Sequence, residues 1–200
     1  MPKLPPALAR LFRIRPLVRP RDLEAVGLEP RLLYTLTQQG LLVRKRRGLY
    51  TLADHTATAQ HNIATVAKLV PQAILCLHTA LRLHRLTAQP TDEIWLALDR
   101  KAWRPIIKQP RVRIVRFSGP ALEDGIETLT IEGTPVRITT AARTVADCFK
   151  YRNKLGLELA LEALRTGWRK KKFTVDDLWD AAETCRVARV MRPYLEATLM

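Results

Sequence analysis

Four consecutive basic residues separate two short apolar segments near the N-terminus, and this stretch constrains the fold more than any other. The cations are Arg44, Lys45, Arg46 and Arg47. Leucine, β-branched and aromatic residues at 41–43 and 49–52 predict two strands, and Gly48 between them predicts a hairpin turn. Because four adjacent charges cannot be buried, we expect them at the exposed tip of this hairpin.

Three short helices are predicted before the hairpin. Residues 4–12 place apolar side chains at helical spacing, with prolines in the first turn. Residues 20–26 begin at a proline and end at Gly27, and a third helix covers residues 30–39 with Gly40 as its C-terminal cap. The N-terminal quarter therefore reads as helices followed by a hairpin.

The third helix has two unlike faces. Its apolar arc holds Leu32, Leu33 and Leu36, which should pack on the preceding helices. The opposite arc carries Arg31, Tyr34, Thr35 and Gln38. Any solvated helix face has a similar composition, but these side chains also suit contacts in a DNA groove.

The order of the predicted elements favours DNA binding. Helix, glycine turn, helix, glycine, strand, basic tip and strand is the order of a winged helix-turn-helix, whose second helix enters the major groove. The tip cations would contact phosphates, and the helix face would supply any sequence preference. Arg19 and Arg21, near the start of the second helix, are predicted as additional phosphate contacts.

The charge distribution agrees with a nucleic-acid partner. The chain of 200 residues has a net charge of +15. Residues 1–53 hold 11 Lys/Arg against 3 Asp/Glu, whereas residues 54–200 hold 23 against 16, so positive charge is densest in the N-terminal quarter. The sequence has no apolar run long enough for a membrane span and no signal core, which predicts a cytoplasmic protein without a membrane partner.

The remainder of the chain predicts a second domain, in which strands and helices come in blocks. An amphipathic helix at 59–70 precedes strands at 94–98, 112–117, 126–131 and 135–138, followed by helices at 140–150, 155–168 and 174–184. The fold class is therefore α+β, with an N-terminal winged helix-turn-helix at 1–53 and a mixed α/β C-terminal domain at 54–200.

Three segments resemble the AbiEi family of antitoxins from type IV abortive-infection toxin–antitoxin systems. They are GLLVRKRRGLYTL at 40–52, HTALRLHRLTAQP at 78–90 and ITTAARTVADCF at 138–149. Thr79 and Ala142 depart from the family pattern, which more often has Ser and Glu there. The resemblance implies an antitoxin active in phage defence.

This resemblance also implies two activities. The winged helix would bind inverted repeats in its own operator as double-stranded DNA and repress transcription. The C-terminal domain would counteract a nucleotidyltransferase-like toxin without a stable complex.

Other functions are weighed against these. Asp92, Glu93 and Asp99 flank an apolar strand, loosely like a metal-dependent nuclease, but the spacing fits solvated strand ends better. A ligand-sensing transcriptional regulator is the other alternative. His78 and His84 are six residues apart and cannot face one ion from a single helix.

We therefore predict no catalytic residues, no metal and no cofactor. Arg143 and Asp147 read as an ion pair on a helix face. Cys76, Cys148 and Cys185 lie in apolar sequence and should be core residues. A second basic run is either a solvated loop or a second binding surface; it consists of Arg169, Lys170, Lys171 and Lys172.

Overall fold

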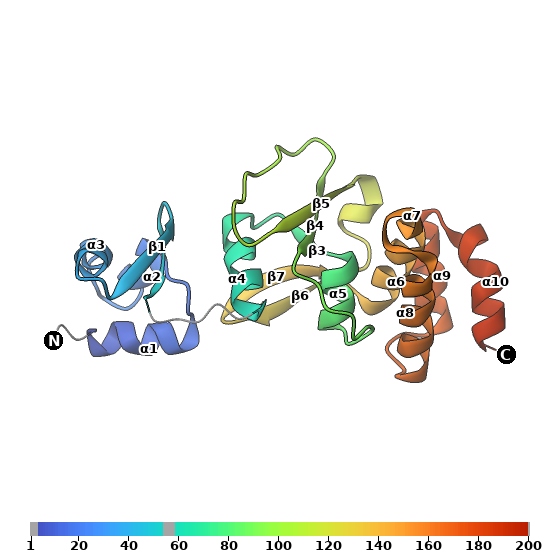
Figure 1. Cartoon of the computed structure of the whole chain (residues 1–200), viewed down its shortest axis with the longest axis horizontal. Coiled ribbons are helices and arrows are strands. Elements are labelled where there is room, and N and C mark those ends of the chain that lie inside the picture. Colours follow the sequence, from blue (N-terminus) through green and yellow to red (C-terminus); the bar gives the residue numbers. More distant parts are fainter. Residues whose placement is uncertain (1–3, 54–58, 200) are drawn as a thin grey trace. The chain divides into compact units, whose positions relative to one another are not determined.

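A computed structural model describes residues 4–53 and 59–199 (Figure 1). The chain divides into two compact units. Unit 1 comprises Met1–Leu69 and Thr130–Pro135, and unit 2 comprises Val70–Leu129 and Val136–Met200. Unit 1 thus includes a helix after residue 58 and the tip of a hairpin from later in the chain.

Unit 1 contains the predicted helices and hairpin. Its elements are α1 (Pro6–Ile14), α2 (Pro20–Glu24), α3 (Arg31–Gln38), β1 (Leu42–Arg46), β2 (Leu49–Leu52) and α4 (Ala59–Leu69). The first three helices and β1 share a small apolar core, formed by Leu8, Phe12, Val18, Leu23, Leu33, Leu36 and Leu42. The predicted helices are confirmed to within two residues at either end, which is the usual uncertainty of helix boundaries.

The hairpin is an irregular antiparallel pair. Its register shifts between Arg44 and Arg46, so Lys45 is an extra residue on β1 and forms a β-bulge. On the far side of β2, Val18 and Tyr50 exchange backbone hydrogen bonds of 2.9 Å. Because Val18 occupies that edge, the cation-bearing β1 lies at the opposite edge of this small sheet.

Unit 2 is organised around a mixed sheet with the strand order β5-β4-β3-β7-β6. The strands are β3 (Ile74–Leu75), β4 (Ile94–Asp99), β5 (Val112–Phe117), β6 (Ile126–Ile131) and β7 (Thr134–Thr139). Strand β4 runs antiparallel to β3 and parallel to β5, and β3 runs parallel to β7. The two parallel pairs require crossover connections between their strands.

Helices complete unit 2. They are α5 (Leu77–Leu83), the 3₁₀ helix η1 (Gly119–Leu122), α6 (Ala141–Lys150), α7 (Arg152–Leu155), α8 (Leu157–Arg169), α9 (Val175–Cys185) and α10 (Ala188–Leu199). The helix predicted at 155–168 corresponds to α8; it begins two residues later, because Gly156 adopts a φ of 88° and separates α8 from the short α7. The predicted α+β class, with an N-terminal winged helix-turn-helix, is confirmed.

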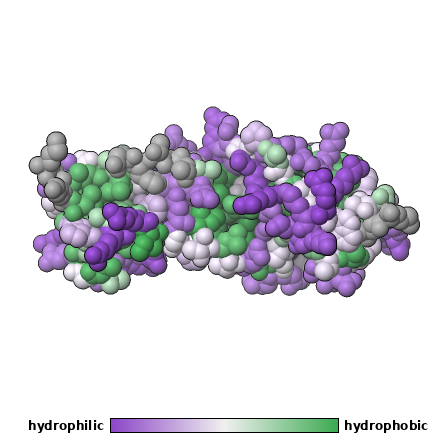
Figure 2. Space-filling view, turned by 90° about the horizontal axis from the view of Figure 1, so that it is seen from below, coloured by the Kyte–Doolittle hydropathy of each residue, from purple (hydrophilic) through white to green (hydrophobic). Residues whose placement is uncertain are grey.

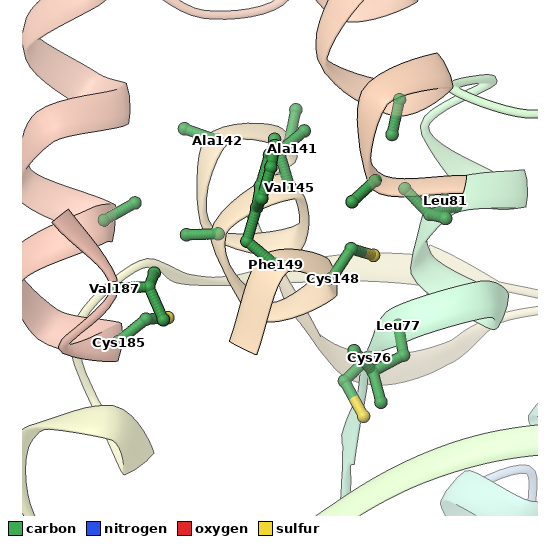
Figure 3. Close-up of a cluster of buried hydrophobic side chains, with 14 of the residues drawn as sticks. Cys76, Leu77, Leu81, Ala141, Ala142, Val145, Cys148, Phe149, Cys185 and Val187 are labelled. Carbon is green, nitrogen blue, oxygen red and sulfur yellow. The ribbon is translucent and has the colours of Figure 1, made fainter. Parts of the chain in front are cut away.

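Helix α6 lies at the centre of the unit 2 core. Every residue from Ala141 to Phe149 is buried. In Figure 3, Cys148 and Phe149 of α6 lie among side chains from α5 and from the end of α9, including Leu81 and Cys185. All three cysteines are free and buried, which confirms the prediction that they are core residues.

A charged pair is enclosed in the same core. The Nε of Arg143 lies 3.3 Å from the Oδ2 of Asp147, and the two side chains are 1% and 0% exposed. Arg143 also donates to the carbonyls of Asp124 and Ala121 at 2.7 and 3.3 Å. The thiol of Cys185 donates to Asp147 at 3.2 Å. The predicted pair exists, but it is buried in the core, whereas a surface pair was expected.

Candidate nucleic-acid interface

The outer face of α3 is exposed as the helical wheel predicts. Arg31, Tyr34, Thr35 and Gln38 are all exposed, and Tyr34 retains 66% of its accessible surface. Leu33 and Leu36 on the opposite face are buried in the unit 1 core. An exposed tyrosine beside donor and acceptor side chains is chemically suited to contact base edges in a major groove.

The four cations of the hairpin are distributed differently from the prediction. The sequence placed all of them at the tip, but Arg44, Lys45 and Arg46 belong to strand β1, and only Arg47 lies in the turn with Gly48. Gly48 has a φ of 72°, a left-handed conformation that glycine adopts at little cost. The strand continues through the cations because hairpin pairing needs only backbone groups, while three of the four side chains remain exposed.

Arg19 and Arg21 differ in their exposure and in their hydrogen bonds within the protein. The guanidinium of Arg19 donates to the carbonyl of Lys68 on α4, and its backbone N–H donates to Asp22 at 2.7 Å. Arg19 is half-buried, whereas Arg21 is exposed. Arg21 is therefore the more accessible of these two predicted phosphate contacts.

Basic side chains from separate segments surround one hollow in unit 1. A hollow of about 400 Å³ is lined by Arg19, Pro20, Arg21, Arg47, Gly48, Leu49, Lys68 and Leu69. Lys68 donates to the carbonyl of Leu17. The pKa of Lys68 is lowered to about 8, chiefly because the side chain is partly buried; Asp22 opposes this shift and nearby arginines add to it. Such a basic hollow has the size and charge to accept a phosphate group.

Sequence reasoning missed Lys68 as part of this surface. The residue lies at the end of α4, after the segment read as the winged helix, and nothing in its neighbourhood marks it as a surface cation. Its position follows from the hydrogen bonds that link Lys68 with Leu17 and Arg19, about 50 positions earlier in the chain.

Residues 6–53, which include this face and the hairpin, match the model of a protein family described as "Transcriptional regulator, AbiEi antitoxin". The chain carries an AbiEi-family domain. The resemblance seen in the sequence is confirmed for this segment. The other two segments that carried it, at 78–90 and 138–149, lie outside the matched residues.

A solved structure resembles both units beyond the AbiEi-family segment. The crystal structure of the RV2827C protein from Mycobacterium tuberculosis superposes with a TM-score of 0.52 and 12% sequence identity, covering 97% of this chain and 82% of that chain. At this identity the similarity concerns the fold alone. No curated protein matches the chain.

The two remaining AbiEi-like segments meet at a cavity in unit 2. A cavity of about 720 Å³ is bordered by His84 from the first segment and by the start of α6 from the second. The Nε2 of His84 lies 2.7 Å from the carbonyl of Thr139, and Thr79 accepts a hydrogen bond of 2.8 Å from the backbone of Trp95. These polar side chains hold α5 against the sheet, so the motifs have clear structural roles.

The second basic run is exposed, but one of its side chains is hydrogen-bonded within the protein. It begins at Arg169, the last residue of α8, and continues into the connection with α9. Lys170 donates to the carbonyl of Arg85 at 2.8 Å, while Arg169, Lys171 and Lys172 are exposed to solvent. Its role as a binding surface stays a prediction.

Two of the three carboxylates weighed as nuclease ligands, Glu93 and Asp99, have structural partners. Asp99 accepts a hydrogen bond of 2.6 Å from the backbone of Lys101, and Glu93 pairs with Arg113 at 2.9 Å. Across residues 4–53 and 59–199, no three His, Cys, Asp or Glu side chains gather in a way that could hold a metal ion. Burial also raises the pKa of the Cys76 and Cys148 thiols, which makes them poor nucleophiles.

Hydrophilic residues cover much of the molecular face in Figure 2, as the high net charge suggests. Within the part of the chain that the structure describes, none of the helices has the length and apolar character needed to cross a bilayer.

Proposed function

We propose that this protein is an antitoxin and transcriptional autorepressor. The AbiEi-family domain binds double-stranded operator DNA, and residues 54–200 counteract a nucleotidyltransferase-like toxin. The observation that carries the proposal is the combination of an exposed polar face on α3 with a basic strand in the segment that matches the regulator family. Regulators of this architecture contact DNA bases with the second helix and the DNA backbone with the wing, which in this chain is the β1–β2 hairpin.

The two parts of the interface have separate roles in this proposal. Arg44, Lys45, Arg46 and Arg47, with Arg21 and the basic hollow beside them, contact phosphates and supply affinity. Arg31, Tyr34, Thr35 and Gln38 contact base edges and select the operator. Arg19 contributes as part of the lining of the hollow, since its guanidinium donates a hydrogen bond to the carbonyl of Lys68 on α4.

A gel-shift experiment on the DNA upstream of the gene tests the wing. The test variant replaces all four wing cations with glutamine: R44Q/K45Q/R46Q/R47Q. Its affinity should fall, and the slope of log K against log salt should flatten by about 0.9 for each phosphate that the wing no longer neutralises. An unchanged salt slope would exclude the wing as a phosphate-binding element.

The matched control removes four exposed positive charges from unit 2: R82Q/R186Q/R189Q/R192Q. It has the same net charge as the wing variant, so operator affinity should stay close to that of the unchanged protein. If both variants lose affinity equally, the effect reflects total charge, and the local contact at the wing is disproved.

Sequence selection is tested on α3. Replacing Gln38 or Arg31 with alanine should weaken operator binding by about 1–3 kcal/mol if each contacts a base, and should relax the preference at one position. Binding to unrelated duplex DNA should change little. Equal loss on both DNAs would make the residue a phosphate contact.

Toxin antagonism is tested by co-expression with a nucleotidyltransferase-like toxin encoded beside the gene. The full-length wing variant should rescue growth as well as the unchanged protein, while a chain ending at residue 53 should fail to rescue. Rescue by that short chain would disprove the assignment of antitoxicity to residues 54–200.

A further inference from the structure

The connection between β4 and β5 is unusual for a crossover between parallel strands. Such crossovers are commonly made by a helix that packs on the sheet. Here residues 100–111 form a long irregular loop that extends from the edge of the sheet (Figure 1). Its apolar side chains are consequently not buried as those of a packed helix would be.

Two large apolar side chains of this loop face solvent. Trp103 is 87% exposed and Ile106 is 75% exposed, while the other strand-region tryptophan, Trp95, is 4% exposed. Leaving an indole in water forgoes the gain from burying one of the largest apolar surfaces among the side chains. Tryptophan in such a position is typical of residues that become buried in a complex.

The same loop is strongly basic. Between Asp99 and Val112 every charged residue is a cation, and each of these cations is exposed: Arg100, Lys101, Arg104, Lys108 and Arg111. In residues 4–53 and 59–199, none of these five side chains forms an ion pair. By contrast, Arg113 on β5 pairs with Glu93 and lies over the ring of Trp95 at 5.0 Å.

The base of the loop is held firmly. Asp99 accepts from the backbone of Lys101 at 2.6 Å, and the guanidinium of Arg116 donates to the carbonyls of Asp99 and Ala102 at 2.8 Å each. Trp103 follows this anchored turn directly. The backbone beside the exposed indole is therefore preorganised, which lowers the entropy cost of binding through it.

We propose that residues 100–111 bind single-stranded nucleic acid, with Trp103 stacked on an unpaired base and the five cations on the flanking phosphates. An indole with both faces accessible can stack on any splayed base, and cations around it follow a phosphate backbone. A paired base in a duplex offers no free face for this stacking. The proposal concerns unit 2 and does not rest on operator binding by the AbiEi-family domain.

Fluorescence anisotropy with the full chain tests the proposal. The probes are labelled oligothymidylate and oligouridylate of about 15 nucleotides, and a labelled duplex of equal length. Trp103→Ala should weaken binding of at least one single strand about tenfold, the loss expected for one stacked base, and leave duplex binding unchanged. Trp103→Phe should keep most of the affinity, because it retains an aromatic face.

The charge contribution is tested with a variant that neutralises the loop: R100Q/K101Q/R104Q/K108Q/R111Q. It should weaken single-strand binding and flatten its salt dependence. The control variant R82Q/R186Q/R189Q/R192Q should do neither. Since all of these side chains are exposed, the variants should keep the melting temperature of the unchanged protein.

Three outcomes would overturn the proposal. The first is unchanged single-strand affinity in Trp103→Ala, which would exclude stacking. The second is an equal loss on the duplex, which would make the loop a duplex contact. The third is competition by polyglutamate as strong as by unlabelled single strands, which would indicate an acidic protein partner. A preference for oligouridylate or for oligothymidylate would identify RNA or DNA as the source.

Discussion

The two units place their charges in opposite ways. Unit 1 carries a row of cations on strand β1 and in the following turn; three of the four are exposed, and Arg47 also borders the basic hollow. Unit 2 encloses Arg143 and Asp147 in its core, where each is at most 1% exposed. An exposed cation is available to a ligand and adds little to folding, whereas a buried pair is unavailable to ligands and must be kept intact. Residue type alone does not separate a binding charge from a structural one.

The largest effect is expected from breaking the buried pair. Asp147→Ala leaves the guanidinium of Arg143 without its carboxylate in the core, so the free energy of unfolding should fall by about 3–5 kcal/mol. Urea unfolding followed by circular dichroism measures it. The control is Arg192→Ala, which breaks an exposed pair with Glu196 of the same i,i+4 spacing and should cost less than about 1 kcal/mol. Equal losses in free energy of unfolding would contradict the expected difference between the buried pair and the exposed pair.

Glycines in the two units also differ in their roles, with smaller expected effects on stability. A Cβ added to Gly167 in α8 would lie 2.3 Å from the ring of Phe173, so Gly167→Ala should destabilise the chain by about 1–3 kcal/mol despite the better helix propensity of alanine. Shortening Phe173 to leucine in the same chain should recover part of the loss. The melting temperature of the single and double variants checks this, and no recovery would mean that the crowding lies elsewhere.

In unit 1 a glycine is needed for conformation. Gly40 has a φ of 73°, and a Cβ there would meet no atom within 4 Å among the described residues. Gly40→Ala should therefore cost only about 1 kcal/mol of backbone strain. Gly40→Asn should cost less, because asparagine tolerates the left-handed region. An asparagine variant as unstable as the alanine variant would argue against a purely conformational cost.

The wing variant R44Q/K45Q/R46Q/R47Q should separate binding from stability. Its free energy of unfolding should change by less than about 0.5 kcal/mol, since three of the four side chains are exposed, while its operator affinity falls. Chemical denaturation and gel-shift assays on one preparation measure both. A large loss of stability would mean that the wing cations have a structural role, as Arg143 does.

A pH-dependent effect is expected from Lys68, a charge between these two extremes. Burial lowers its pKa to about 8 in the folded chain, below the 10.5 of an ordinary lysine. Between these two pH values the unfolded chain holds more protons, so the contribution of Lys68 to stability should rise with pH. The free energy of unfolding of the unchanged protein minus that of Lys68→Met should become more positive from pH 8 to 10.5. A constant difference would mean that the pKa is not lowered.

Much of unit 1 was predictable because its signals are local. Proline at the start of α1 and α2, glycine after α3, and the alternation of leucine with polar residues on α3 act within a few positions of the chain. The exposed face of α3 follows from helical geometry once its leucines pack inward. The bulge at Lys45 was not predictable, because it depends on how β1 pairs with β2.

Two residues that matter most to the proposals had no recognisable local signal. The segment around Trp103 has apolar and basic residues in no regular period, and only the anchored turn at Asp99 and the lack of a packing helix leave the indole exposed. Lys68 joins the basic hollow because α4 returns to the start of the chain. Both positions are set by contacts between segments distant in sequence.

The sequence by itself determined the helices, the hairpin, the glycine turns and the excess of positive charge, since these depend on neighbouring residues and on composition. Only the tertiary structure decided which charges are buried. Arg143–Asp147 and Arg192–Glu196 have the same spacing on helices, yet one pair is enclosed and the other is exposed. Burial depends on what packs over a side chain, and those elements come from elsewhere in the chain.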